Sequence, residues 1–136
     1  MQLFTSTGTL RYGVTNLVLD VDQGLSDYYR ALMPKSIRTN KQMYPAHISV
    51  VRKENPPNME LWGKYAGELI EFQYSNVIRN GTVYYWLDAW SKRLEEIRLE
   101  LGLPVDSPYT RPPDGMSKTF HITLGNIKEL VQSKGA

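Results

Sequence analysis

The chain has 136 residues, of which 41% are hydrophobic and 22% are charged, and its net charge at neutral pH is only +2. This composition predicts a single globular domain over residues 1–136 and excludes a disordered chain. Because the chain contains no cysteine, disulfides, cysteine-ligated metal sites and thiol nucleophiles are also excluded. No apolar run approaches the ~20 residues that span a bilayer, and the first residues do not resemble a secretory signal, so we expect no membrane partner and a cytoplasmic location.

The first half of the chain predicts two strands and a short helix. Residues Leu10–Val21 are rich in β-branched and aromatic side chains, as expected for a strand. Ser26 is a suitable N-cap for a helix over Asp27–Leu32, and a second strand covers Ala46–Arg52. Basic residues gather near that second strand, where a solvated surface is their default interpretation: Lys35, Arg38, Lys41, Arg52 and Lys53.

The second half predicts a hairpin followed by one clear helix. The β-rich runs Leu69–Ile78 and Thr82–Leu87 are joined through an Asn-Gly pair, which adopts positive φ easily and favours a hairpin. A helix follows, capped by Asp88 and ended by Gly102, because apolar residues recur on one face: Trp90, Leu94, Ile97 and Leu101.

A long proline-rich segment, Pro104–Ser117, precedes the last predicted strand, Lys118–Gly125. A loop of this length inside a compact domain is often a lid or a binding loop. Taken together, the predicted strands, short connections and helices indicate an α+β fold with mainly antiparallel pairing.

The only two histidines of the chain lie in matching four-residue motifs, 74 residues apart, which are called the histidine words below. His47–Val50 and His121–Leu124 each read histidine, isoleucine, hydroxyl residue, apolar residue. Since residues i and i+2 of a strand point to the same face, each histidine shares a face with its hydroxyl residue while the apolar residues face the core. If the two strands are neighbours, two imidazoles and two hydroxyls converge on one cleft.

These four groups are suited to the cleavage of a phosphodiester. A neutral imidazole can take a proton from the attacking oxygen, and a protonated one can give a proton to the leaving oxygen. The hydroxyls of Ser49 and Thr123 can donate hydrogen bonds to the non-bridging oxygens. We therefore predict His47, Ser49, His121 and Thr123 as catalytic residues, with no cofactor and no metal, and the sequence does not tell which histidine is the acid.

Three other interpretations of the two words stay open. Each histidine can be a structural residue of its strand. A metal site could combine the histidines with Asp114 or a glutamate, although neither word supplies the further ligands that zinc normally takes. Ser49 could be a nucleophile, although no nucleophile elbow surrounds it.

Paired His-x-[Ser/Thr] words on separate strands resemble the two-histidine (2H) phosphoesterase superfamily. This resemblance implies a bilobal α+β fold, in which mainly antiparallel sheets with flanking helices surround a central cleft and each lobe contributes one motif. Longer words resemble the phage anti-CBASS cyclic-nucleotide phosphodiesterases and cover most of the chain: Arg11–Gly13 with Asn16-Leu17, Ser26–Arg30, Pro45–Arg52, Tyr84–Leu87 through Leu103-Pro104, Tyr109–Pro113 and Phe120-His121.

The closer resemblance implies hydrolysis of the 3′–5′ bonds of cyclic di- and trinucleotides such as 3′,3′-cGAMP, the signals of bacterial CBASS defence against phage. A phage-encoded protein of this kind acts in the host cell cytoplasm. Within the resembling words, Tyr12, Trp86, Tyr109 and Arg111 are candidates for binding bases or phosphates, although Tyr12 and Trp86 are equally suited to a core.

Two alternative functions use the same groups. One is an RNA 2′,3′-cyclic phosphodiesterase, and the other is a sponge that binds a cyclic nucleotide without cutting it. The low net charge argues against a stable nucleic-acid partner, because sequence-independent RNA binding normally needs an extended basic surface. An oligomer is compatible with the sequence.

Overall fold

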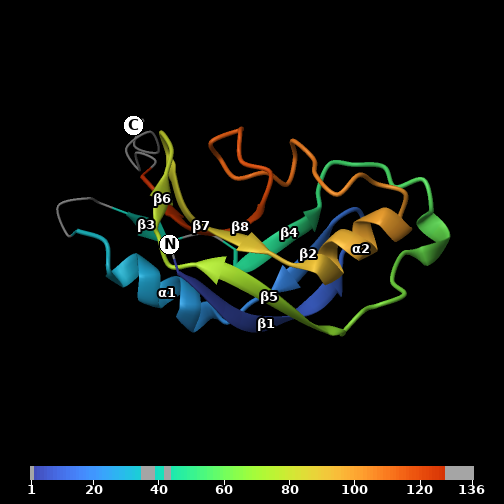
Figure 1. Cartoon of the computed structure of the whole chain (residues 1–136), viewed down its shortest axis with the longest axis horizontal. Coiled ribbons are helices and arrows are strands. Elements are labelled where there is room, and N and C mark those ends of the chain that lie inside the picture. Colours follow the sequence, from blue (N-terminus) through green and yellow to red (C-terminus); the bar gives the residue numbers. More distant parts are fainter. Residues whose placement is uncertain (1, 35–38, 42–43, 128–136) are drawn as a thin grey trace, which may run out of the picture.

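The computed structural model describes residues 2–34, 39–41 and 44–127, and Figure 1 shows the course of the chain. Its elements in chain order are β1 (Leu3–Tyr12), β2 (Leu17–Asp20), α1 (Gln23–Ala31), β3 (Asn40–Lys41), β4 (His47–Val51), a short 3-10 helix (Met59–Leu61), β5 (Leu69–Ser75), β6 (Arg79–Asn80), β7 (Tyr84–Trp90), α2 (Lys92–Glu100) and β8 (Phe120–Asn126). Among these residues, no helix is long and apolar enough to cross a membrane.

Six of the eight described strands form a closed antiparallel sheet. The hydrogen-bonded order is β8, β4, β2, β1, β5 and β7, and β7 pairs back onto β8. The two-residue strands β3 and β6 attach to β8 and β7 respectively. The predicted α+β class and the mainly antiparallel pairing are therefore confirmed.

The order of the elements repeats within the chain. The first half contains two strands, a helix and a strand (β1, β2, α1, β4), and the second half contains the same series (β5, β7, α2, β8). The halves join where β1 pairs with β5 and where β4 pairs with β8. Each histidine word therefore occupies the last strand of its half, and the two words meet at one of the two junctions.

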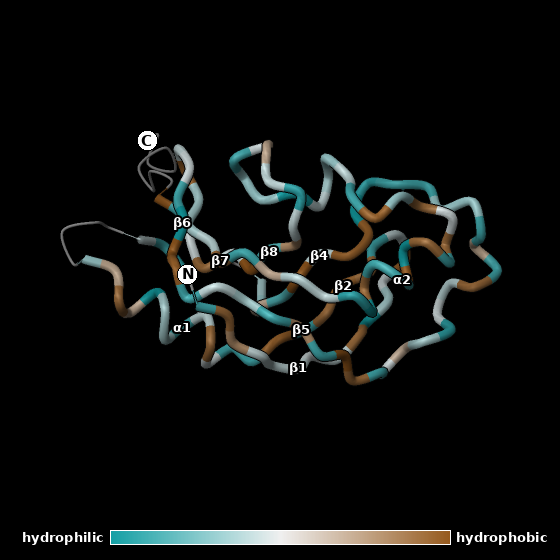
Figure 2. Tube along the Cα trace, in the orientation of Figure 1, coloured by the Kyte–Doolittle hydropathy of each residue, from teal (hydrophilic) through white to brown (hydrophobic). Residues whose placement is uncertain are grey.

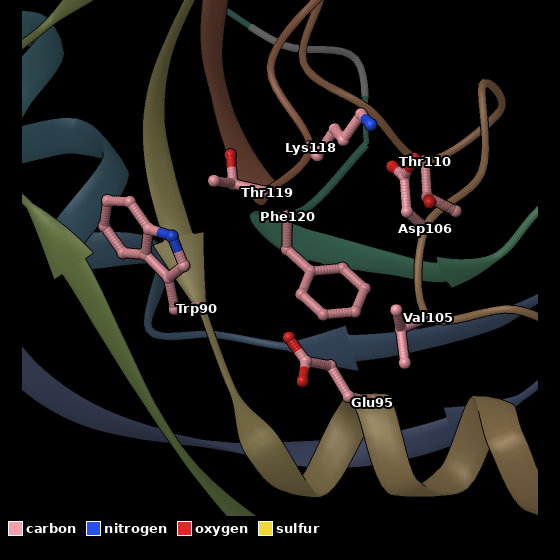
Figure 3. A pocket seen from close by; sticks show the side chains of 8 residues that line it. All are labelled: Trp90, Glu95, Val105, Asp106, Thr110, Lys118, Thr119 and Phe120. Carbon is pink, nitrogen blue, oxygen red and sulfur yellow. The ribbon is translucent and has the colours of Figure 1, made fainter.

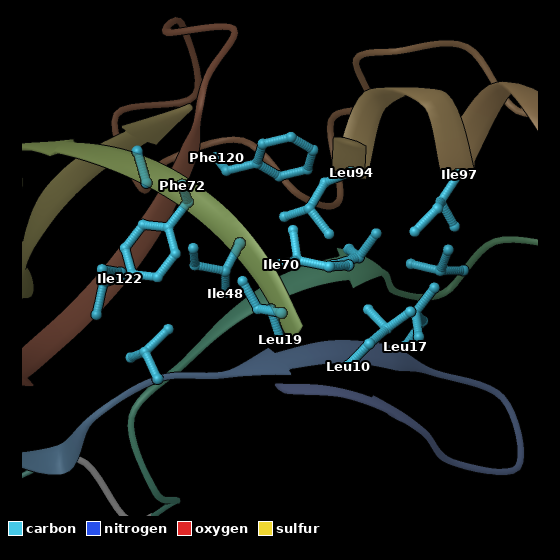
Figure 4. Close-up of a cluster of buried hydrophobic side chains, with 14 of the residues drawn as sticks. Leu10, Leu17, Leu19, Ile48, Ile70, Phe72, Leu94, Ile97, Phe120 and Ile122 are labelled. Atoms are coloured by element: carbon cyan, nitrogen blue, oxygen red, sulfur yellow. The ribbon is translucent and has the colours of Figure 1, made fainter. Parts of the chain in front are cut away.

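The core fills the inside of the closed sheet. Alternate residues of each strand point inward, which matches the two-residue period of a half-buried strand. Figure 4 shows these side chains converging from different strands, with two residues of α2 beside them: Leu10, Leu19, Ile48, Ile70, Phe72, Ile122, Leu94 and Ile97, all of which are at most 1% exposed.

Two predicted elements of the first half are corrected by the structure. The predicted strand Leu10–Val21 is wrong as a single element, because a turn closed by a 2.7 Å hydrogen bond from the Gly13 amide to the Asn16 carbonyl divides it into β1 and β2. Helix α1 begins earlier than predicted, since the carboxylate of Asp22 accepts from the Gly24 amide as N-cap. Ser26, the predicted cap, is buried inside the helix.

The second half contains two similar differences. The Asn-Gly pair does lie at a turn, but this turn joins β6 to β7 through a 3.0 Å hydrogen bond from the Gly81 amide to the Tyr84 carbonyl. The cap of α2 is Ser91, whose hydroxyl accepts from the Leu94 amide, so Asp88 belongs to strand β7. The positive φ of 87° at Gly102 confirms the predicted helix end.

Gly8 lets β1 approach β2 closely. A Cβ atom at this position would lie 2.5 Å from the Asp20 carbonyl oxygen and 2.7 Å from the Leu19 side chain. We expect Gly8→Ala to reduce the free energy of unfolding by about 1–3 kcal/mol, the usual cost of overpacking. Urea unfolding measures this, and Thr7→Ala, at an exposed neighbour, should cost less than about 1 kcal/mol. Equal losses in the two variants would contradict the steric argument.

Candidate active site

The pairing of β4 with β8 places the two histidine words side by side. Ile48 lies opposite Ile122, and both side chains point into the core with no exposed surface. The described strands β4 and β8 pair at this one position, and the residues on either side of it, His47 with Thr123 and Ser49 with His121, flank the pair on the other face of the sheet. These four half-buried residues are called the histidine face below. The predicted adjacency of the two strands is confirmed.

The register also determines the spacing within the histidine face. Directly opposed residues of antiparallel strands have Cβ atoms about 4.5–5.5 Å apart, and diagonal neighbours are about 7–8 Å apart. His47 and His121 occupy one diagonal about the single Ile48–Ile122 pair, and Ser49 and Thr123 occupy the other. The charge of His47 acts on the His121 ring, which places both rings beside a common space. This arrangement can hold one phosphate group between two imidazoles.

His47 has a defined ring orientation. Its Nδ1 lies 2.8 Å from the carbonyl oxygen of Pro45. A carbonyl oxygen can only accept, so Nδ1 carries the proton of this hydrogen bond. The Nε2 atom of His47 is therefore the one available for proton transfer, as an acceptor in the neutral ring and as a donor in the protonated ring.

His121 is held in a different electrostatic environment. Burial lowers its pKa from the ordinary 6.5 to about 4, and the nearby positive charges of His47 and Arg52 act in the same direction. The backbone of Thr110 and the carboxylate of Asp88 oppose this shift. The Nδ1 atom of His121 is buried and has no hydrogen bond of good geometry to a described residue. At neutral pH the His121 ring is therefore uncharged.

An aspartate flanks each histidine on the next strand. On β2, Asp20 lies opposite His47, and Arg11 binds both of its carboxylate oxygens at 2.7 and 3.0 Å. On β7, Asp88 lies opposite His121, and Arg79 donates to it at 2.8 Å. Asp20 and Asp88 therefore hold equivalent positions in the two halves of the chain, as the repeated order of the elements requires.

The proline-rich segment covers the His121 side of the histidine face. Arg79 ties it to β6 through Asp114 at 2.8 Å and Ser117 at 3.2 Å. Burial raises the pKa of Asp114, but hydrogen bonds from Ser117 and Met116 and the charge of Arg79 outweigh it, so the pKa lies well below the ordinary range. Figure 2 shows residues 104–118 as a largely hydrophilic segment above β4 and β8.

A small hollow lies beside the histidine face, at the base of this segment (Figure 3). It measures about 10 Å³, which is room for about one water molecule, and it contains neither histidine. It is lined by Trp90, Glu95, Val105, Asp106, Thr110, Lys118, Thr119 and Phe120. The buried Thr119 hydroxyl there lacks a hydrogen bond to any described residue. A nucleotide does not fit this hollow, so the histidine face itself is the candidate site.

Two of the predicted substrate-binding aromatic residues are packed by other side chains: Tyr12 is half-buried, and Trp86 is buried on the histidine side of the sheet, opposite Thr123. Trp86 is 0% exposed, and the Arg79 guanidinium lies 5.3 Å from its ring centre, so its ring offers no surface to a base. Tyr12 packs against the core and contacts Trp62 edge to face at 5.1 Å. These contacts account for both rings as packing residues, and a role of either ring in substrate binding stays a prediction.

The other two predicted binding residues lie on the segment that covers the site. Tyr109 is 47% exposed and accessible to a ligand. Arg111 is paired with both carboxylate oxygens of Asp106, the shortest contact being 2.6 Å, so its guanidinium shapes the loop around the buried Thr110. Lys35 and Arg38 lie outside the described residues.

Sequence reasoning missed Asp20, Asp88 and Arg79. Asp88 was predicted as a helix cap, and only the register of β7 against β8 places it beside His121. Asp114, considered above as a metal ligand, is bound by Arg79 instead. Within residues 2–34, 39–41 and 44–127, no three histidine, aspartate or glutamate side chains gather in a way that could hold a metal ion.

Comparison of the chain with protein-family models, curated proteins and solved structures finds no significant match.

Proposed function

We propose that this chain is a metal-independent phosphodiesterase of the 2H type, which cleaves the 3′–5′ bonds of cyclic di- and trinucleotide signals. The observation that carries the proposal is the pairing of Ile48 with Ile122, because this register sets both histidines and both hydroxyl residues on one face. A structural role alone does not require two matching pairs of proton-transfer and hydrogen-bonding groups on adjacent strands.

The repeated order of the elements supports the 2H assignment. Two halves with the series strand, strand, helix, strand each contribute one word, which is the arrangement that a bilobal fold with one motif per lobe requires. The junction of β4 and β8 then corresponds to the cleft between the lobes. In the phage family that the sequence resembles, such an activity removes the signals of bacterial CBASS defence.

The two rings suit different roles in the first chemical step. His121, uncharged at neutral pH, takes the proton of the ribose 2′-hydroxyl as its oxygen bonds to phosphorus. His47, protonated at Nε2, gives a proton to the 5′ oxygen as the bond from phosphorus to that oxygen breaks. The product is a 2′,3′-cyclic phosphate with a free 5′-hydroxyl.

The second step reverses the roles. Water attacks the cyclic phosphate and loses a proton to His47, and the His121 imidazolium returns a proton to the 2′ oxygen. Ser49 and Thr123 donate hydrogen bonds to the non-bridging oxygens in both steps, where negative charge accumulates in the transition state.

A test of this function is incubation of the purified protein with 3′,3′-cGAMP in excess EDTA. We expect linear dinucleotide as the product, detected by chromatography and mass spectrometry, because imidazoles and hydroxyls supply the catalysis that a metal would otherwise provide. A panel of other cyclic di- and trinucleotides, together with an RNA that ends in a 2′,3′-cyclic phosphate, compares the substrate classes.

The double variant His47→Ala/His121→Ala serves as control for contaminating nucleases. If the protein instead binds the cyclic nucleotide and releases it intact on denaturation, it is a sponge and not an enzyme. If the protein rapidly opens the 2′,3′-cyclic phosphate of the RNA and does not act on any cyclic oligonucleotide, its substrates are RNA ends.

A further inference from the structure

Asp88 has the position of an electrostatic partner for His121. It lies directly opposite His121 in the β7–β8 register, so their Cβ atoms are about 4.5–5.5 Å apart. Its side chain is only 9% exposed. The Trp86 indole donates to one carboxylate oxygen at 2.9 Å, and Arg79 donates to the other at 2.8 Å. The carboxylate is therefore fixed and poorly screened by water.

The charges around His121 come from several elements. His47 and Arg52, from β4 and the residue after it, disfavour a proton on the ring, as burial does. Asp88 on β7 and the Thr110 backbone in the covering segment favour it. Arg79 on β6 contacts Asp88 and Asp114, so it acts on His121 through the carboxylate that it neutralises. Asp88 is thus a carboxylate that shifts His121 toward its protonated form from a fixed position on the next strand.

We propose that Asp88 is a positioning residue that stabilises the imidazolium formed when His121 takes up a proton, and that Arg79 limits this effect. The inference rests on the proposed function, in which His121 is protonated after the first step. Arg79, which is shared between Asp88 and Asp114, offsets part of the negative charge of Asp88 while the His121 ring is neutral. When the ring gains its proton, the carboxylate is already in place beside it.

The other flank of the histidine face provides a matched comparison. Asp20 holds the same strand position beside His47, but its side chain is 35% exposed and that of its partner Arg11 is 57% exposed. Water screens such an exposed pair strongly. We therefore assign the electrostatic role to Asp88 and treat Asp20 as its control.

The test is an NMR titration of the imidazole Cε1 protons. The chain has only two histidines, so His47→Ala and His121→Ala assign both signals directly. In Asp88→Asn, which keeps an oxygen for Trp86, we expect the His121 midpoint to fall by about one pH unit. In Arg79→Gln, the Asp88 carboxylate loses its positively charged partner and should raise the His121 midpoint by a similar amount. Asp20→Asn should leave the His121 midpoint unchanged.

These opposite shifts distinguish electrostatics from a structural role. If the two substitutions merely opened the site to water, loss of burial would raise the His121 midpoint toward 6.5 in both variants. Equal upward shifts, or no shift in either variant, would overturn the inference. We also expect the kcat of Asp88→Asn on 3′,3′-cGAMP to fall about 10-fold with little change in KM. Titration shifts as expected in a protein without turnover would contradict the phosphodiesterase assignment and leave the Asp88–His121 coupling intact.

Discussion

Replacement of His121 or His47 by alanine is expected to slow turnover of 3′,3′-cGAMP by about 10²–10⁴-fold, the usual share of one general acid or base. Each ring has one proton to move in each step, and no other described residue on the histidine face can replace it. The rate is measured in EDTA at saturating substrate. Because the two rings act on the same transition state, the double variant should lose much less than the product of the two single effects.

The fold of these variants needs its own check. Both histidines are half-buried, so a thermal melt of each variant by circular dichroism is compared with that of the parent. Ser49→Ala is the matched variant for the hydroxyls and should reduce kcat by about 10²–10³-fold if its hydroxyl stabilises the transition state. A folded His121→Ala protein with near-parental turnover would rule out the paired mechanism.

Arg98→Met is expected to reduce the free energy of unfolding by about 3–5 kcal/mol, because it leaves a buried carboxylate without its partner. Arg98 is 0% exposed and pairs with Glu54 at 2.8 Å. It also donates to the carbonyl oxygens of Val50 at 2.8 Å and Pro104 at 2.7 Å. The guanidinium therefore joins the end of β4 to α2 and to the start of the covering segment. Urea unfolding measures the loss.

The control for this variant is Arg93→Met on the same helix. Arg93 pairs with Glu68 at 2.7 Å, but both side chains are about one third exposed, at 30% and 32%. A partly exposed pair of this kind contributes about 0–1 kcal/mol. Arg93 also lies 4.4 Å from the centre of the Tyr65 ring, a contact that contributes about 0.5–1 kcal/mol, so Arg93→Met should cost clearly less than Arg98→Met. Losses of unfolding free energy of similar size in the two variants would show that burial does not increase the contribution of the Arg98 pair to stability.

The Arg98 effect should also depend on pH. Burial raises the pKa of Glu54, but hydrogen bonds from Arg98 and from the Arg52 backbone outweigh it, so the pKa lies below the ordinary 4.5. A lowered carboxyl pKa contributes stability that is complete above the pKa of the unfolded chain, about 4.3, and is lost as the pH falls through the folded value. The difference in unfolding free energy between parent and Arg98→Met should therefore narrow as the pH falls. Narrowing begins above pH 4.5, because burial raises the Glu54 pKa in the variant that lacks Arg98, and it continues through the lowered Glu54 pKa of the parent.

The histidine face could be predicted from the sequence because its signal is local. A histidine and a hydroxyl residue two positions apart share a face on any strand, and two matching words point to a common site. The partners of those residues depend on strand register, which no local pattern contains. Asp88 could be placed beside His121 only once β7 and β8 were aligned.

Burial of charged and aromatic residues was also beyond the sequence patterns. Helical periodicity identifies the apolar face of α2 and leaves Arg98 outside it, because the pattern counts a charge as solvated and does not see a buried partner 44 residues away. The burial of Trp86 beside Arg79, on the same face as Thr123, depends on strand register and on a contact from β6, which no local pattern contains. The closed sheet likewise results from the long-range pairing of β7 with β8.

Closure of the sheet has a consequence for self-association. An open sheet ends in two strands with unpaired amide and carbonyl groups, which can recruit a strand of another molecule and start aggregation. In the described part of this chain, the pairing of β7 with β8 leaves the two-residue strands β3 and β6 at the ends of the sheet, and residues 3–8 of β1 pair with β5 but not with β2. Strand addition by another copy of this protein is therefore confined to short segments, of which the first residues of β1 are the longest among those named here.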